Sequence, residues 1–112
     1  MKTTSIHTAE QKPNPHGVVV QQMYNQPDAQ VVHITLQPGE ALKPHKTPVD
    51  VFFFVLEGTP TVHIGDETKT FDKDTLIESP KDIVHFLSNE GTGIARILVV
   101  KTPNPIGQTK VL

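Results

Sequence analysis

His45 and His85 are the residues whose type and placement could support chemistry, since they lie on different expected strands. An imidazole titrates near neutral pH, so it can act as a general acid or base, bind a metal ion or anchor a polar ligand. The chain has no cysteine, which leaves His, Asp and Glu as its strong metal ligands. Two imidazoles alone make a weak metal site, because a bound metal usually has three or more protein ligands. The sequence shows no nucleophile or orienting carboxylate next to either histidine, so it gives no positive sign of acid–base catalysis.

The clearest strand follows His45 and is bounded by turn signals at residues 38–39 and 57–60. It contains six consecutive apolar residues, 51–56, and such a run cannot alternate between core and water. Both faces must therefore be covered, one by the interior of a barrel or sandwich and the other by a second sheet or a second subunit. By parity the first face carries Val51, Phe53 and Val55, and the second carries Phe52, Phe54 and Leu56.

The rest of the chain is predicted to be all-β, because no apolar period of 3.6 persists and short strands alternate with Gly or Pro turns. A chain of 112 residues is enough for one domain. Residues 1–17 are polar and contain prolines, so an N-terminal arm or edge segment is expected there. Residues 18–102 are expected to form the barrel, and residues 103–112 an extended or disordered C-terminal tail.

In two expected strands the alternation of apolar and polar residues predicts the direction in which a further histidine points. In the expected strand 31–36 the more apolar set faces the core, which points His33 outward. In the expected strand 61–65 the same argument points His63 outward, before a tight hairpin at Gly65 and Asp66. Both histidines are therefore expected on the surface or at an interface. The other predicted strands are 18–24, 68–71, 75–79, 83–88 and 94–101.

Composition excludes some classes of partner. The net charge is −2 and the lysines are scattered, so the chain lacks the basic surface that nucleic acids or anionic membranes require. The N-terminus has no apolar segment of signal or membrane length, which predicts a soluble, cytoplasmic protein.

Residues 39–58 resemble the first motif of the cupin superfamily, written G-x5-H-x-H-x3,4-E-x6-G. Gly39, His45 and Gly58 occur at the motif spacings. Two positions depart from it, since Thr47 stands where the second His belongs and Val51 where the Glu belongs.

Residues 74–89 resemble the second cupin motif, G-x5-P-x-G-x2-H-x3-N. Pro80, His85 and Asn89 match with the expected separations. Asp74 and Asp82 replace the two glycines, and aspartate also tolerates tight turns and positive φ.

The resemblance covers roughly residues 31–100 and implies a double-stranded β-helix (jelly-roll) barrel. Metal-binding cupins hold Fe, Mn, Ni, Zn or Cu with three His and one Glu, and this sequence retains His45 and His85 of that set. The motif spacing implies that both rings point inward and meet across the barrel. A divalent transition metal (Zn, Ni, Fe or Mn) at this pair is one expectation, and a barrel without metal is the other.

Five further residues bear on the site. Thr47 offers a hydroxyl, which is a poor metal ligand but a usable polar contact, and Phe53 is expected to line the cavity or to be plain core. Asp50 is one residue before Val51 on the same strand, so its side chain should point away from the site unless a bulge intervenes. Glu78 is expected as a rim or salt-bridge residue, and Asn89 as a turn former.

Two functions remain open at this level. The first is a module that binds a small molecule in the barrel, with His45, Thr47, Phe53 and His85 as contacts and a weak metal site as an addition. The alternative is a metal-dependent enzyme of the dioxygenase, isomerase or decarboxylase class acting on a small polar substrate. A homodimer, with the N-terminal arm exchanged to cover the face of Phe52, is compatible with either. Substrate identity does not follow from fold membership.

Overall fold

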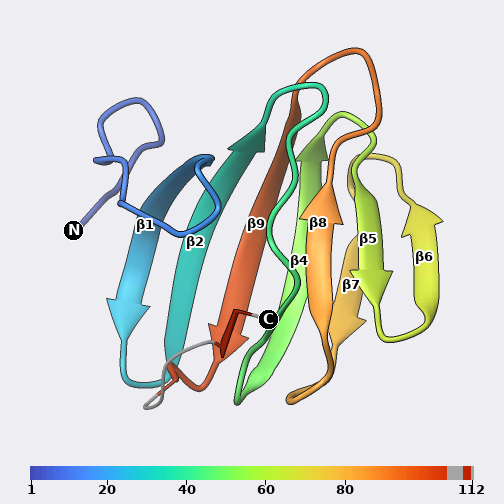
Figure 1. The fold of residues 1–112 in the computed structure, drawn as a ribbon. Coiled ribbons are helices and arrows are strands. Elements are labelled where there is room, and N and C mark those ends of the chain that lie inside the picture. The colour runs from blue at the N-terminus through green and yellow to red at the C-terminus, as the bar shows by residue number, and fades with distance from the viewer. Residues whose placement is uncertain (106–109, 112) are drawn as a thin grey trace.

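The computed structural model describes residues 1–105 and 110–111, the last two by their backbone alone. Within these residues the chain forms ten strands and no helix, arranged as two five-stranded antiparallel sheets (Figure 1). The all-β prediction is confirmed. The described residues contain no helix that is long and apolar enough to span a membrane.

The two sheets take their strands from both halves of the chain, as in a jelly roll. The first has the order β1 (Val19–Gln26), β2 (Ala29–Leu36), β9 (Ala95–Thr102), β4 (Asp50–Glu57) and β7 (Leu76–Ser79). The second has the order β10 (Lys110–Val111), β3 (His45–Lys46), β8 (His85–Ser88), β5 (Thr61–Ile64) and β6 (Glu67–Thr70).

The turns follow the local sequence closely. Gly65 and Asp66 make the tight β5–β6 hairpin, with Gly65 at a φ of 57°. Asp74 and Asp82, which replace the motif glycines, adopt φ values of 67° and 61°, so the expectation of positive φ is confirmed. The boundaries differ in places: β1 continues through Gln26, which the sequence had indicated as part of a turn.

The core lies between the sheets and contains the predicted inner face of β4. Val51, Phe53 and Val55 are all buried. Around them pack apolar side chains from both sheets and from the loop before β3, namely Ile34, Leu36, Leu42, Val62, Leu87, Ala95, Ile97 and Val99. The central strands are thus held by apolar burial, the main stabilising term in a domain of this size.

The outer face of β4 is less well covered. Phe52, Phe54 and Leu56 are only half-buried, and Leu76, which pairs with Phe54, is 50% exposed. The second sheet packs on the inner face instead. Among the described residues no second sheet covers this outer face, so that expectation is not met.

Both ends of the chain pack on the barrel. Gln11 bridges to Gln21 of β1, and the Lys12 amide donates to the Val20 carbonyl over 2.7 Å, so the N-terminal segment runs beside β1 (Figure 1). At the other end β10 pairs with β3, which places part of the expected tail in the second sheet. Residues 106–109 and 112 of that tail lie outside the described residues.

Candidate functional site

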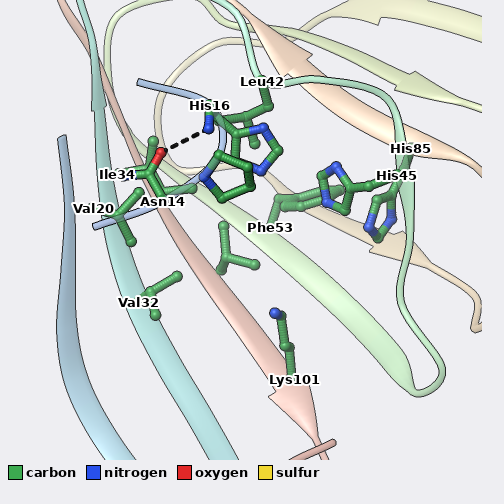
Figure 2. Close-up of a pocket in the computed structure, with 12 residues that line it drawn as sticks. Asn14, His16, Val20, Val32, Ile34, Leu42, His45, Phe53, His85 and Lys101 are labelled. Atoms are coloured by element: carbon green, nitrogen blue, oxygen red, sulfur yellow. Dashed lines mark hydrogen bonds between the residues drawn. The ribbon is translucent and has the colours of Figure 1, made fainter. Parts of the chain in front are cut away.

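A cavity of about 250 Å³ opens between the two sheets. Its walls are mostly apolar, and its polar groups come from three separate parts of the chain: the N-terminal segment, the β3–β8 pair and the end of β9 (Figure 2). The lining residues are Asn14, Pro15, His16, Val20, Val32, Ile34, Leu42, His45, Phe53, His85, Val99 and Lys101.

His45 and His85 meet as the motif spacing implies. They are direct partners in the β3–β8 register, and their ring centroids are 4.7 Å apart at an angle of 72°. Phe53 contacts His85 edge-on, with 5.4 Å between centroids, and supplies the apolar wall beside it. The structure therefore brings together three of the four predicted contact residues.

His85 is buried with both ring nitrogens hydrogen-bonded. Nδ1 lies 2.6 Å from the Ser79 hydroxyl and Nε2 lies 3.2 Å from the Thr47 hydroxyl. Burial, with smaller contributions from the charges of His45 and Lys101, lowers the pKa of His85 to about 4. His85 is thus a neutral ring at physiological pH, with no nitrogen left for a ligand.

Thr47, the fourth predicted contact, lies behind His85 and does not line the cavity. Its side chain is 1% exposed. Thr47 can therefore influence a ligand only through the orientation of the His85 ring.

Within the part of the chain that the structure describes, one ring nitrogen of His45 has no hydrogen-bond partner. Its Nδ1 must donate to the Lys43 carbonyl, 2.7 Å away, because a carbonyl oxygen only accepts. The neutral ring then carries an unprotonated Nε2. Burial lowers the pKa of His45, the bond to Lys43 opposes this, and the charge of Lys101 adds to the lowering. His45 therefore offers a hydrogen-bond acceptor.

His16 completes a row of three imidazoles that the sequence did not predict. Its ring centroid is 5.2 Å from that of His45. Its Nδ1 accepts from the Lys43 amide over 2.8 Å, so the neutral ring carries its proton on Nε2. Burial lowers the pKa of His16 to about 4, with smaller contributions from the charges of His45, Lys43 and Lys101. No sequence pattern marks His16, because the N-terminal segment reaches the cavity only through tertiary packing.

Lys101 is the second residue that sequence reasoning missed. Its side chain points toward the cavity from the end of β9 (Figure 2). Parity would have identified it, since Lys101 is on the same face as Ile97 and Val99. Burial lowers the pKa of Lys101. Within the described residues it forms no ion pair, and no carboxylate lines the cavity.

The cupin domain model matches residues 32–101 of the chain. The chain belongs to the cupin family. A search of curated proteins finds no match. Solved structures share the fold: the TT1209 protein of Thermus thermophilus is 24% identical, with a TM-score of 0.80 over 94% of this chain and 100% of that chain. A cupin family protein with a double-stranded β-helix fold from Methanocaldococcus jannaschii is 24% identical, with a TM-score of 0.75 over 88% and 91% of the two chains. The polyketide cyclase RemF of Streptomyces resistomycificus is 15% identical, with a TM-score of 0.85 over 100% and 85%.

The metal site implied by cupin membership does not fit the donors present. The described residues contain no group of three or more His, Asp or Glu placed to hold an ion. His85 has both nitrogens in hydrogen bonds, and the Nδ1 of His16 is taken by a backbone amide, which leaves Nε2 of His45 as the available imidazole lone pair. One free imidazole is too few for a structural or catalytic metal.

The carboxylates weighed from the sequence lie elsewhere in this cupin. Asp50 is exposed and accepts from the Lys81 amide over 3.0 Å, so it points away from the cavity as expected. Glu78 is exposed on β7 and lines no part of the cavity. Asn89 is buried in its turn, where its side chain bonds to the carbonyls of Leu36 and Gly93 and to the Gly91 amide.

The expectation of a surface His33 is wrong, although the ring does face away from the cavity. His33 is 1% exposed, because Gln21 and Arg96 close over it. Gln21 is in turn bonded to the carbonyls of Ile6 and Ala9, which brings the N-terminal segment onto this part of the sheet. Parity gives the face of a side chain but not what covers that face.

His63 is half-buried on the outer side of the second sheet. Its ring stacks on Phe86 at 3.9 Å between centroids and bonds to the hydroxyls of Thr68 and Ser88. These contacts make it a structural residue of the sheet surface.

Proposed function

We propose that this cupin binds a small organic molecule whose single polar group is an oxygen acceptor, such as a carbonyl or a carboxylate. One observation carries the proposal: the cavity combines an apolar wall with one amine and no carboxylate within the described residues. Such a site disfavours cationic ligands and favours oxygen acceptors.

The polar contacts differ from those expected from the motifs. Lys101 and Nε2–H of His16 are donors, and Nε2 of His45 is an acceptor. His85 supplies an aromatic surface that Thr47 and Ser79 hold in place. Phe53 continues that surface as an apolar wall. The cavity volume of about 250 Å³ is below the usual range for drug-sized ligands, which implies a ligand of about one ring.

Benzoate and benzylamine test the proposal, because they share a ring and differ in the charge of the polar group. Benzoate should shift the methyl resonances of Val99 and Leu42, and benzylamine should not. Lys101→Met should weaken benzoate binding roughly tenfold or more, since a hydrogen bond to a charged group contributes about 1.5–3 kcal/mol. Lys73→Met, at an exposed turn, is the control. Equal binding of the two compounds would contradict the proposal.

We also propose that the protein works in the cytoplasm as a homodimer through the outer face of β4. The support is the half-buried apolar row of Phe52, Phe54 and Leu56 together with exposed Leu76. Continuous apolar surface of this kind marks interfaces. Sedimentation at micromolar concentration should give a dimer that Phe54→Glu dissociates, whereas a monomeric wild type would refute the assembly.

A further inference from the structure

Lys101 is the one amine among the described residues that line the cavity, and its surroundings are unusual for a lysine. It shares its strand face with Ile97 and Val99, which are buried in the core. Its side chain runs along the apolar wall and ends among the cavity residues (Figure 2). Within the described residues no carboxylate neutralises it. Most lysines instead keep the ammonium in water.

Such surroundings favour the neutral amine. Burial in an apolar wall disfavours the ammonium form, and the pKa of Lys101 is accordingly lowered. A neutral lysine amine in a hydrophobic pocket is a nucleophile toward carbonyl carbon, which an ammonium is not. Simple anion binding does not require this desolvation.

The cavity also contains a group that can move the protons that such a reaction requires. His45 offers an unprotonated Nε2, and it lines the same cavity as Lys101. His16 offers Nε2–H as a donor to a carbonyl oxygen. Both rings have lowered pKa values and are neutral near pH 7.

We propose that Lys101 forms an imine with an aldehyde or ketone ligand bound in this cavity. The amine nitrogen bonds to the carbonyl carbon, and the C=O π pair moves to oxygen. His45 carries two protons in turn from nitrogen to oxygen. The first transfer gives the carbinolamine, and the second lets the oxygen leave as water while the C=N bond forms. Amine and carbonyl thus give imine and water with no oxidant or reductant. This inference rests on the proposed function and specifies its ligand class as carbonyl compounds.

Reductive trapping tests it on the full-length wild-type chain. The protein is mixed with benzaldehyde and sodium cyanoborohydride near pH 7, and the benzylated lysines are located by peptide mass mapping over time. Lys101 should be modified several-fold faster than Lys73, and saturating benzyl alcohol, which fills the cavity without a carbonyl, should slow Lys101 alone. Modification of Lys101 at the rate of Lys73, or no effect of benzyl alcohol on it, would overturn the proposal.

Two readouts keep this inference separate from the function on which it rests. Benzyl alcohol and benzoate are followed by the methyl resonances of Val99 and Leu42, which report occupancy without reaction. Shifts without selective trapping refute the imine and leave the binding proposal standing. Absence of both refutes the two together. His45→Gln should slow trapping at Lys101 several-fold, and an unchanged trapping rate would contradict the proton transfer proposed for His45.

Discussion

His45 and His85 face each other across the β3–β8 pair with 4.7 Å between ring centroids, yet their nitrogens have different partners. The nitrogens of His85 bond to the hydroxyls of Thr47 and Ser79. His45 bonds to the Lys43 carbonyl through one nitrogen, and its other nitrogen has no partner among the described residues. Two adjacent imidazoles therefore have different roles. His85 is a structural ring, and His45 is available to a ligand.

Replacing Thr47 by valine should destabilise the fold, because it keeps the shape and removes the hydroxyl on Nε2 of buried His85. The expected loss is about 1–3 kcal/mol, the cost of leaving a buried polar atom without a partner. Urea denaturation measures it, with Thr92→Val on an exposed loop as the control. A loss no larger than that of the control would show that the bond contributes nothing to stability.

Stability should fall as the pH is lowered through the mildly acidic range. The pKa of folded His85 is about 4, below its ordinary value of 6.5, so the unfolded chain binds the extra proton. The contribution of His85 is complete above about pH 6.5 and is lost progressively toward pH 4, with a slope of up to about 1.4 kcal/mol per pH unit.

Urea denaturation at several pH values tests this dependence. His85→Asn should flatten the slope between pH 6.5 and 4, while the exposed variant His7→Asn controls for removing an imidazole. An equal slope in wild type and His85→Asn would exclude His85 as its source.

Gln21→Ala should loosen the N-terminal segment without unfolding the barrel. The Gln21 amide donates to the carbonyls of Ile6 and Ala9 and accepts from His33, so its loss removes three contacts at once. Hydrogen exchange at the amides of residues 8 and 9 should accelerate. Gln22→Ala, on the neighbouring position of β1, is the matched control, and equal exchange in the two variants would contradict the prediction.

Gly58→Ala should be destabilising by more than about 1 kcal/mol, because the new Cβ meets backbone and the φ of 78° is left-handed. The added carbon would lie 2.9 Å from Cα of Ala95 and also press on the Ile94 carbonyl. Gly93→Ala is the control, since nothing lies within 4 Å of its added carbon. Thermal or urea unfolding of the two variants measures the difference, which should vanish if the β4 end can shift.

Zinc and nickel ions should raise the Tm of the wild type no more than that of His45→Ala. A site with one available imidazole lone pair binds too weakly to shift unfolding at micromolar metal. Elemental analysis of the purified protein adds a second measurement. A stabilisation that His45→Ala abolishes would instead show that His85 releases Thr47 to bind an ion.

Local chemistry made much of this molecule predictable. The run Val51 to Leu56 could only be a strand, and Asp74 and Asp82 could stand for glycine because aspartate accepts positive φ. The meeting of His45 and His85 was implied by the resemblance of two segments to the two cupin motifs. Each of these features depends on residues close in sequence or on well-defined motifs.

The missed features depend on contacts between distant segments. His16 reaches the cavity because the N-terminal segment packs beside β1, and His33 is buried by Gln21 and Arg96, which lie 12 and 63 positions away. Nothing in the local pattern of either histidine encodes these partners. Lys101 is different. The alternation of side chains along β9 already placed it on the same face as the core residues, but lysine is usually expected at the surface.

The main chain at position 43 sets where the protons lie in this cavity. Its amide donates to one imidazole and its carbonyl accepts from the next, so both tautomers are fixed by main-chain hydrogen bonds of a single residue. The amino acid at position 43 can therefore change over evolution without altering the two tautomers. Proline, which removes the amide hydrogen, is the exception, and it would free the first ring while leaving the second as it is.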